Sequence, residues 1–391
     1  MTISRRRLLQ TSLAISAGIA WARLGVSARE EASAELDLNI HTKLPLNGEP
    51  SLEKLVAERI TPVEHFYVRN HGPTPQVKRD DYRLSIAGLV HKPQSFSLDQ
   101  ILEKFKPREI EATLTCAGNR RVEMSAIKPI GGVPWNAGAI GNAQWQGALL
   151  ADVLASAELR EGAKHIWFEG LDSIPEKDGS TAPFGGSISL EKIAEGNDAS
   201  PVLAAYQMNG DALTAEHGFP LRMVVPGYIG ARSVKWLSKI VVSDRPSPNH
   251  YVAEAYKIIR SDDKVELAAA TPIYEFALNA AICLPAAKSR LEAGRSKVAG
   301  YALPSGAEGA LLKKVELSLD GGKTWNTAKL LGDAQAATWQ LWSIEVELTP
   351  KVTNLVVRAT DNRGNVQPET TPWNLKGYMQ NSWHQVPITV V

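Results

Sequence analysis

The sequence lacks an excess of charge of either sign. Its 391 residues contain 43 lysines and arginines against 42 aspartates and glutamates, which gives a formal net charge of +1 at pH 7. A protein that binds the phosphate backbone of a nucleic acid needs a strongly basic surface, and this composition does not supply one. We therefore expect no nucleic-acid partner.

Cysteine is also scarce, because the chain has only Cys116 and Cys283. Two cysteines in a chain of this length exclude a small disulfide scaffold. Cys116 lies in a loop rich in Gly, Asn and Arg (residues 115–121), whereas Cys283 lies in an apolar segment typical of a strand or buried turn. Since nearby arginines favour a thiolate, Cys116 is a candidate ligand or nucleophile. A disulfide between the two cysteines is the alternative in an oxidising compartment.

No hydrophobic run is long enough for a membrane span. The uncharged run of residues 8–22 is short and contains Ser, Thr and Gly. It follows Arg5, Arg6 and Arg7 and precedes small residues at 26–28, which together are typical of a signal peptide. Paired arginines before Leu-Leu resemble the twin-arginine export signal. We expect residues 1–28 to be this signal and the protein to be periplasmic, with a basic amphipathic helix as the alternative.

Hydrophobic residues make up 44% of the chain, enough for two or three packed domains. Residues 29–60 are a polar lead-in with an expected short helix at 51–60. Residues 61–258 mix short strands (82–86, 166–168, 221–225, 239–242) with helical stretches (99–105, 149–157) and Gly/Pro-rich loops, which predicts an α+β domain. Residues 259–391 alternate apolar and polar side chains around turns, as at 315–319 and 341–348, which predicts an all-β sandwich of immunoglobulin type.

Three segments of the expected α+β domain combine Arg, His and Asn with Gly. They are residues 65–71, the Cys116 loop, and residues 217–236. Guanidinium groups and exposed amides of this kind suit an anionic ligand. Each segment taken alone is also compatible with an ordinary surface loop, but all three occur together with an export signal and a lone loop cysteine.

Six motifs in order along the chain resemble the sulfite oxidase family of molybdenum enzymes. They lie at residues 66–71, 115–121, 168–172, 209–220, 230–236 and 373–377. The resemblance extends from about residue 60 to the C-terminus, and no single motif has to carry it. It implies a sulfite oxidase-type molybdopterin-binding domain followed by a dimerisation domain, and a molybdenum–molybdopterin cofactor.

The resemblance also assigns roles to individual positions. Cys116 matches the cysteine whose thiolate binds molybdenum as a soft ligand. The positions matching residues that hold the molybdopterin are Arg69, Asn70, His71, Asp172, His217, Arg222, Ser233, Val234 and Lys235. The positions matching residues of the substrate pocket are Arg69, Arg121, Trp135 and Tyr256. Tyr256 is a candidate hydrogen-bond donor and proton relay, with simple packing at a domain junction as the alternative.

Lys376 departs from the family pattern, in which vertebrate and plant members have an arginine. Lysine keeps the charge but loses the bidentate fork, so we expect Lys376 to be a pocket residue with altered anion affinity.

The resemblance implies that the protein oxidises sulfite to sulfate. The chain has no Cys-x-x-Cys-His motif and no segment suited to a b-type haem domain, so we expect electrons to pass to an external periplasmic cytochrome c. We also expect a homodimer and no membrane span. Two alternatives stay open: an exported molybdoenzyme that reduces S- or N-oxides, and a non-catalytic anion-binding or adhesion module.

Overall fold

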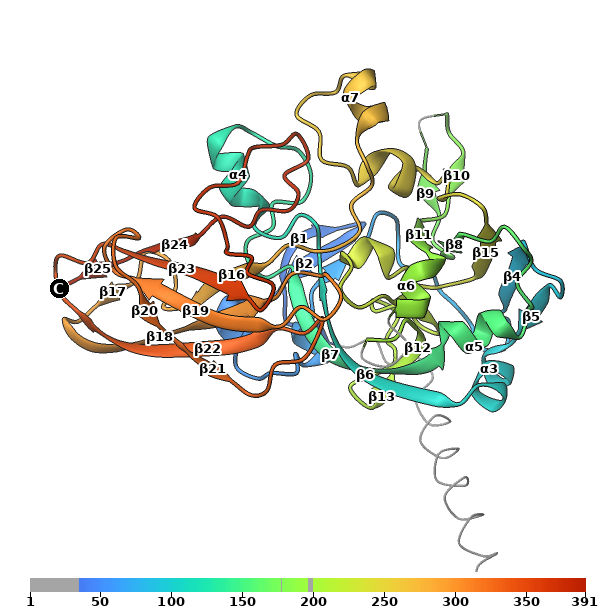
Figure 1. The fold of residues 1–391 in the computed structure, drawn as a ribbon, viewed down its shortest axis with the longest axis horizontal. Helices are drawn as coiled ribbons and strands as arrows, with labels where there is room; N and C mark the ends of the chain where they lie inside the picture. Colours follow the sequence, from blue (N-terminus) through green and yellow to red (C-terminus); the bar gives the residue numbers. More distant parts are fainter. Residues whose placement is uncertain (1–34, 177, 196–199) are drawn as a thin grey trace, which may run out of the picture.

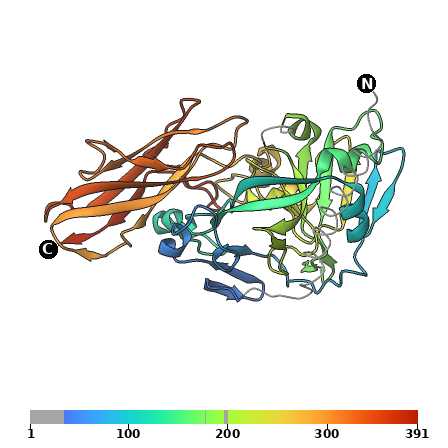
Figure 2. The ribbon, with the colours of Figure 1, turned by 90° about the horizontal axis from the view of Figure 1, so that it is seen from below.

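The chain folds into two bodies that lie side by side along the long axis of the molecule (Figures 1 and 2). The computed structural model describes residues 35–176, 178–195 and 200–391. The expected signal peptide at residues 1–28 lies outside the described residues. The first body contains the motifs with Arg, His and Asn, and the second carries the C-terminal strands.

A mixed five-stranded sheet forms one layer of the first body. Its strands, in spatial order, are β11 (Gly185–Ser189), β8 (His165–Glu169), β15 (Lys239–Ser243), β4 (Leu84–Gly88) and β5 (Gln94–Phe96). Only β15 and β4 run parallel to each other. The expected strands at 82–86, 166–168 and 239–242 are present here, with ends that differ by a few residues.

A second, antiparallel sheet packs against the first. Its path runs through β13 (Asp211–Ala212), β12 (Leu203–Met208), β7 (Ile140–Leu149) and β6 (Pro107–Thr115), while β14 (Arg222–Val224) also pairs with β12. The core between the sheets joins Ile86 and Ile240 of the first sheet to Ala204 and Met223 of the second. Strands β6 and β7 form a long hairpin whose connection, residues 116–139, contains the Cys116 loop.

Short helices accompany these sheets. They are α3 (Leu98–Lys104), α4 (Arg121–Ile127), α5 (Leu150–Ala155) and α6 (Leu190–Glu195). Ser97 begins α3 with a capping box, in which its hydroxyl accepts from the Gln100 amide and the Gln100 side chain accepts from the Ser97 amide. The prediction of an α+β domain is confirmed.

The N-terminal lead-in folds onto the first body. Strands β1 (Asn39–Lys43) and β2 (Leu46–Glu49) form a sheet with β3 (Val68–Arg69), which precedes Asn70 and His71. Helix α2 (Leu52–Leu55) is shorter than the helix expected at 51–60. It ends early because the following chain is held by other contacts: the Arg59 carbonyl accepts from Trp339 and Asn142, and the Thr61 amide donates to the Asn142 carbonyl.

The second body is a sandwich of two four-stranded sheets. One contains β16 (Asn279–Leu284), β18 (Gly294–Leu303), β22 (Gln340–Leu348) and β21 (Lys329–Leu331), and the other contains β20 (Asn326–Thr327), β19 (Leu312–Ser318), β23 (Asn354–Asp361) and β24 (His384–Pro387). A small sheet joins β17 (Arg290–Leu291) to β25 (Thr389–Val390). Alternating side chains such as Val298 and Val315 fill the core between the large sheets. The predicted sandwich is confirmed.

Small elements fill the junctions between these layers. They are η1 (Val63–His65), β9 (Ile174–Pro175), β10 (Thr181–Ala182), the 3-10 helix η2 (Gly230–Arg232), the π-helical turn η3 (Tyr251–Ala255) and α7 (Lys264–Ala269). Helix α7 lies in the part of the chain expected to hold only strands. Asp263 caps α7 by accepting from the Val265 amide. An N-cap aspartate is a local sequence signal for a helix, but the strand-like alternation of the later residues hid it.

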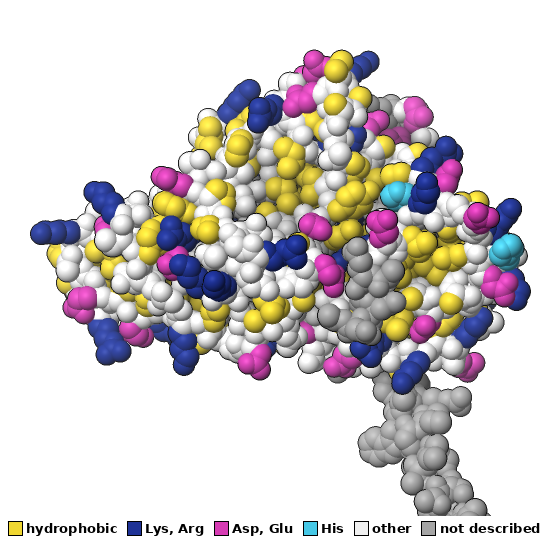
Figure 3. Space-filling view, viewed as in Figure 1, with side chains coloured by type: hydrophobic (Ala, Val, Ile, Leu, Met, Phe, Trp, Pro, Cys, Tyr) yellow, Lys and Arg dark blue, Asp and Glu magenta, His cyan; other side chains and the backbone are white. Residues whose placement is uncertain are grey.

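The surface mixes charges of both signs. In Figure 3, basic and acidic side chains are interspersed over the face shown, and hydrophobic side chains gather between α4 and α7. The exposed large hydrophobic residues include Ile127, Ile258 and Val265. Within the residues that the structure describes, no helix has the length and apolar character needed to cross a bilayer.

Candidate active site

A cavity lies at Cys116, where strand β6 ends. Of the fourteen residues expected to form the site, eleven line this cavity: Arg69, Asn70, His71, Cys116, Asp172, His217, Arg222, Ser233, Val234, Lys235 and Tyr256. Cys116 follows β6 and Asp172 follows β8, whereas Arg69 lies in β3 and Arg222 in β14, so the fold gathers segments far apart in the sequence around one thiol.

The Cys116 loop holds its thiol in a defined position. The Cys116 amide donates to the Ala139 carbonyl at 2.9 Å, which extends the pairing of β6 and β7 by one residue. The Gly118 amide donates to Cys116 Sγ at 3.4 Å. Cys116 and Cys283 are both free and buried, so the disulfide alternative is wrong. An amide donor aimed at the sulfur stabilises negative charge there.

Three cations surround the cavity without a carboxylate partner. Within the described residues, no acidic oxygen lies within 4.0 Å of the charged nitrogens of Arg69, Arg222 or Lys235. Arg222 instead donates to the carbonyls of His217 and Ser233, at 2.9 and 3.3 Å. Burial lowers the pKa of Arg222 to about 10. The carboxylates of Asp172, which lines the same cavity, and of Glu216 act on Lys235 from beyond ion-pair distance. The three cations thus outnumber the nearby carboxylates, and since buried charge is costly unless it is paired, the arrangement suits an anionic ligand.

Lys235 joins two motifs across the cavity. Its Nζ donates to the Asn70 side-chain oxygen and, at 2.7 Å, to the Glu216 carbonyl. Burial, reinforced by the charge of Arg222, lowers the pKa of Lys235 well below its usual value. Burial also raises the pKa of Asp172, whose carboxylate accepts from the Phe184 amide. A bound anion such as a phosphate would favour the charged form of Lys235.

His71 connects the two pocket residues Arg69 and Tyr256. Arg69 Nη2 lies 2.9 Å from His71 Nε2, and the Tyr256 hydroxyl lies 3.2 Å from the same nitrogen. A guanidinium only donates, so Nε2 is an unprotonated acceptor. Burial and the charge of Arg69 lower the pKa of His71 well below its usual value, which agrees with a neutral ring. Burial raises the pKa of Tyr256, which therefore keeps its proton.

The remaining three expected residues lie beside this cavity and do not line it. Arg121 is buried and donates from Nε to the Lys376 carbonyl and from Nη1 to the Val133 carbonyl, at 3.0 and 2.8 Å. Trp135 is fully buried, packs edge-on to Tyr67, and its indole Nε1 has no acceptor within the described residues. Lys376 contacts Arg121 through its backbone carbonyl and is not among the residues that line the cavity.

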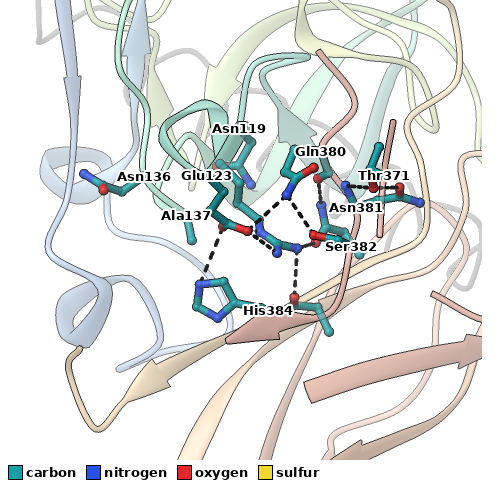
Figure 4. Close-up of polar contacts among 12 residues, drawn as sticks. Asn119, Glu123, Asn136, Ala137, Thr371, Gln380, Asn381, Ser382 and His384 are labelled. Atoms are coloured by element: carbon teal, nitrogen blue, oxygen red, sulfur yellow. Dashed lines mark hydrogen bonds and ion pairs between the residues drawn. The ribbon is translucent and has the colours of Figure 1, made fainter. Parts of the chain in front are cut away.

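The Cys116 loop is anchored on the second body (Figure 4). Asn119 donates to the Tyr301 hydroxyl of β18 at 3.0 Å, and that hydroxyl donates to the Ala137 carbonyl at 2.9 Å. Gln380 donates to the Glu123 carboxylate of α4 at 3.1 Å. The sandwich therefore helps to fix the loop that carries the thiol.

Several residues at the site were missed from the sequence. Asn47 of β2 accepts from the Asn70 amide at 2.9 Å and from Arg69 at 3.1 Å. Phe184 and Tyr251 flank the His71 ring, with centroids 4.8 and 4.4 Å away. Nothing in the polar lead-in marked Asn47. Tyr378 stacks on Tyr256, and its position directly after the 373–377 motif is a signal that could have found it.

Comparison with known proteins agrees with this geometry. A family profile described as an oxidoreductase molybdopterin binding domain matches residues 71–251, and one described as a Mo-co oxidoreductase dimerisation domain matches residues 270–391. Sulfite oxidase of Gallus gallus is 40% identical over 361 residues, covering 89% of this chain and 77% of the relative. Sulfite oxidase of Arabidopsis thaliana is 36% identical over 383 residues, covering 91% and 95%.

A solved structure shows the same architecture. The sulfane dehydrogenase SoxCD from Paracoccus pantotrophus is similar with a TM-score of 0.76 and 25% sequence identity, over 92% of this chain and 91% of that one. The fold and the site thus define a molybdopterin-binding oxidoreductase with a C-terminal dimerisation domain. Within that class, the chain belongs to the sulfite oxidase family.

The residues present fit a molybdenum–molybdopterin cofactor. Cys116 offers a soft, buried thiol of the type that molybdenum accepts. Arg222 and Lys235, which form no ion pair with a carboxylate in the part of the chain that the structure describes, offer the charge that the pterin phosphate requires. Cys116 would hold the metal, and the cations that line the same cavity would hold the organic part of the cofactor.

Proposed function

We propose that the protein oxidises sulfite to sulfate at a molybdenum–molybdopterin centre held by Cys116. The observation that carries this proposal is a buried thiol with the Arg69 guanidinium on the same cavity and Arg121 beside it, neither of which has a carboxylate within ion-pair distance among the described residues. Arg69 lines the cavity of Cys116, and Arg121 Nη2 lies 2.4 Å from where a Cβ on Gly118 would stand. Guanidinium groups converging beside a metal ligand suit a small oxyanion.

The cofactor supplies the two-electron chemistry when it is bound. The chain's own residues bind and orient the anion. Arg69 and Arg121 offset the charge of sulfite, and because both are fixed by hydrogen bonds they need little reorganisation. The Tyr256 hydroxyl keeps its proton and can donate it in a hydrogen bond to an oxygen of the anion. Its single proton goes either to the anion or to Nε2 of neutral His71, 3.2 Å away; because Arg69 also donates to that nitrogen, turning the proton towards the anion leaves His71 hydrogen-bonded.

The test is sulfite-dependent reduction of cytochrome c on samples whose molybdenum content is measured. Activity that scales with molybdenum supports the proposal. Metal-loaded protein that ignores sulfite, but whose reduced form is reoxidised by an S- or N-oxide, would favour the reductase alternative. Protein that takes up no molybdenum, when expressed with the cofactor available, would favour a non-catalytic binding module.

We further propose that the protein is exported to the periplasm by the twin-arginine pathway. Arginines at positions 5–7, followed by an uncharged segment and small residues, support this. Removal of residues 1–28 takes away four arginines and no acid, which leaves a formal net charge of −3. Replacement of Arg5, Arg6 and Arg7 by lysine is expected to retain the protein in the cytoplasm. Equal periplasmic amounts of both forms in cell fractions would contradict export by this route.

We also propose an external cytochrome c as electron acceptor and a homodimer as the working form. The match of residues 270–391 to a dimerisation domain supports the second point. Sedimentation of the purified protein, expected at twice the chain mass of 42.4 kDa before signal removal, tests the homodimer. Stopped-flow mixing of sulfite-reduced protein with cytochrome c tests the acceptor.

A further inference from the structure

Tyr378 contacts two residues of the proposed anion pocket at once. Its ring stacks on the Tyr256 ring, with centroids 5.2 Å apart and planes inclined by 17°. The Arg121 guanidinium carbon lies 5.3 Å from the centroid of the same ring. Tyr378 belongs to the C-terminal segment that follows strand β23. This segment runs beside α4 in Figure 1. Residues of the second body therefore reach the catalytic pocket.

One nitrogen of the Arg121 guanidinium has no hydrogen-bond acceptor among the described residues. The Arg121 Nε and Nη1 are used by the carbonyls of Lys376 and Val133, whereas Nη2 has no acceptor among the described residues. Glycines give the guanidinium its space: a Cβ on Gly118 would stand 2.4 Å from Nη2, and one on Gly377 would stand 2.7 Å from Cγ. Because glycines offer no side chain to pack against, the Tyr378 ring adds to the restraint that the Lys376 and Val133 carbonyls place on this charge.

The segment that carries Tyr378 is itself rigidly held. Asn374 accepts from the Tyr378 amide at 3.0 Å and donates to the Tyr378 carbonyl at 2.9 Å, closing a small loop. The next residue, Met379, donates its amide to the Ala117 carbonyl at 2.8 Å. The ring is therefore fixed relative to the Cys116 loop and to the Asn374 turn.

We propose that Tyr378 is a positioning residue that sets the pocket's affinity for its anion by holding the Arg121 guanidinium beside Tyr256. The inference rests on the proposed function, because it assumes that the anion is sulfite or sulfate. A cation–π contact in a desolvated site is strong enough to change anion affinity about tenfold through the arginine it restrains. Burial raises the pKa of Tyr378, so the ring acts as a neutral phenol.

The experiment compares Tyr378→Leu and Tyr378→Phe in the full-length, molybdenum-loaded protein. We measure KM and kcat for sulfite, and separately the Kd for sulfate by calorimetry, which needs no turnover. Tyr378→Leu is expected to raise KM and Kd about tenfold, with a smaller fall in kcat. Tyr378→Phe keeps the ring and is expected to restore both constants to near the unmodified values. Unchanged KM and Kd in Tyr378→Leu would overturn the proposal.

A double-variant cycle shows whether Tyr378 acts through Arg121. Arg121→Lys removes the guanidinium, so adding Tyr378→Leu to it is expected to raise Kd little further. Fully multiplicative effects of the two changes would mean that the residues act independently, against the proposal. If Tyr378→Leu does not fold, Tyr378→His replaces it in the same comparison. Histidine keeps a ring at this position, but one of a different shape.

Trp373→Leu is the matched control from the same segment. Trp373 also lies under a cation, with Lys128 Nζ 4.7 Å from its ring, and its indole donates to the Lys128 carbonyl. It contacts neither Arg121 nor Tyr256. An equal loss of sulfate affinity in Trp373→Leu and Tyr378→Leu would assign the effect to the segment as a whole and overturn a specific role of the Tyr378 ring.

Failure of the proposed function gives a different result. If the unmodified protein holds molybdenum and binds sulfate but does not oxidise sulfite, the proposed reaction is wrong, while the sulfate Kd of the variants still decides the role of Tyr378. If the unmodified protein oxidises sulfite but binds no measurable sulfate, the KM of the variants decides the role of Tyr378; if it neither oxidises sulfite nor binds sulfate, both proposals fall. If it oxidises sulfite and Tyr378→Leu matches it in KM and Kd, only the Tyr378 inference falls.

Discussion

The guanidinium of Arg120 forms a two-pronged ion pair with the carboxylate of Glu123. The Nε–Oε1 and Nη2–Oε2 distances are both 2.7 Å, and the Arg120 side chain is fully buried. Its third nitrogen donates to the Asn279 side chain of β16 at 2.7 Å. Arg120 caps helix α4 in the left-handed conformation, with φ of 66°. This one side chain therefore ties the Cys116 loop to the sandwich.

Arg120→Ala is expected to lower the free energy of unfolding by about 1–3 kcal/mol, because the Asn279 oxygen loses its donor and Glu123, whose side chain is 29% exposed, keeps the donor of Gln380 but loses its ion pair. Chemical denaturation of the purified protein measures the change. Arg245→Ala is the control, since Arg245 is 78% exposed and lies 3.9 Å from Asp244. Exposed pairs of this kind contribute little. A similar loss of unfolding free energy in both variants would show that burial does not account for the contribution of the Arg120–Glu123 pair.

Cys116→Ser is expected to fold and be exported but to lose sulfite oxidation, because a hydroxyl is a poor substitute for a soft thiolate ligand. Activity per molybdenum bound is the measurement. Cys283→Ala is the control: Cys283 is buried in the core shared with Ala281 and Leu303, and burial raises its pKa to about 12. Near-normal turnover in Cys116→Ser would remove Cys116 from the role of ligand.

Arg69→Ala is expected to raise KM for sulfite strongly and to lower kcat as well. The side chain supplies charge to the pocket and also holds the His71 ring through Nε2. Steady-state kinetics over a range of sulfite concentrations separates the two effects. An unchanged KM would place Arg69 outside the substrate pocket.

Gly118→Ala is expected to displace the Arg121 guanidinium, because the added Cβ would stand 2.4 Å from Nη2 and 2.7 Å from Cζ. Overpacking of this kind costs about 1–3 kcal/mol. We expect a raised KM with molybdenum content retained. Gly131→Ala is the control from the same β6–β7 connection, where a Cβ would meet nothing within 4 Å. Equal kinetics for the two variants would contradict the tight fit around Arg121.

The stability of the protein is expected to depend on pH through His384. Its Nδ1 accepts from the Ile282 amide at 3.0 Å, and burial, with the charge of Arg120, lowers its pKa from 6.5 to about 4. Between these values the unfolded chain binds the proton and the folded protein does not. The stabilisation is therefore complete above pH 6.5 and is lost as the pH falls towards 4, by about 1.4 kcal/mol per pH unit.

His384→Asn keeps an oxygen acceptor for the Ile282 amide but has no titrating group. Its melting temperature is expected to fall less steeply than that of the unmodified protein as the pH drops from 6.5 to 4. Thermal unfolding at a series of pH values tests this, and parallel curves for the two proteins would refute a contribution from His384.

Local patterns in the sequence predicted much of the fold. Alternation at 315–319 and 341–348 placed strands β19 and β22, because side chains on a half-buried strand must alternate between core and solvent. The helix at 51–60 was overestimated, since contacts of Arg59 and Thr61 with distant residues outweigh helix propensity there.

The candidate site, like the fold, was predicted only in part from the sequence. The sequence by itself determined the residue types around the cavity, because motifs such as 115–121 and 230–236 are continuous and their chemistry is visible in the residues. Only the tertiary structure decided that the Tyr378 ring lies against the Arg121 guanidinium, that Asn47 accepts from the Asn70 amide, and that the Lys376 carbonyl accepts from Arg121. These contacts join residues far apart in the chain, and their geometry depends on how the two bodies pack together, which no local pattern encodes.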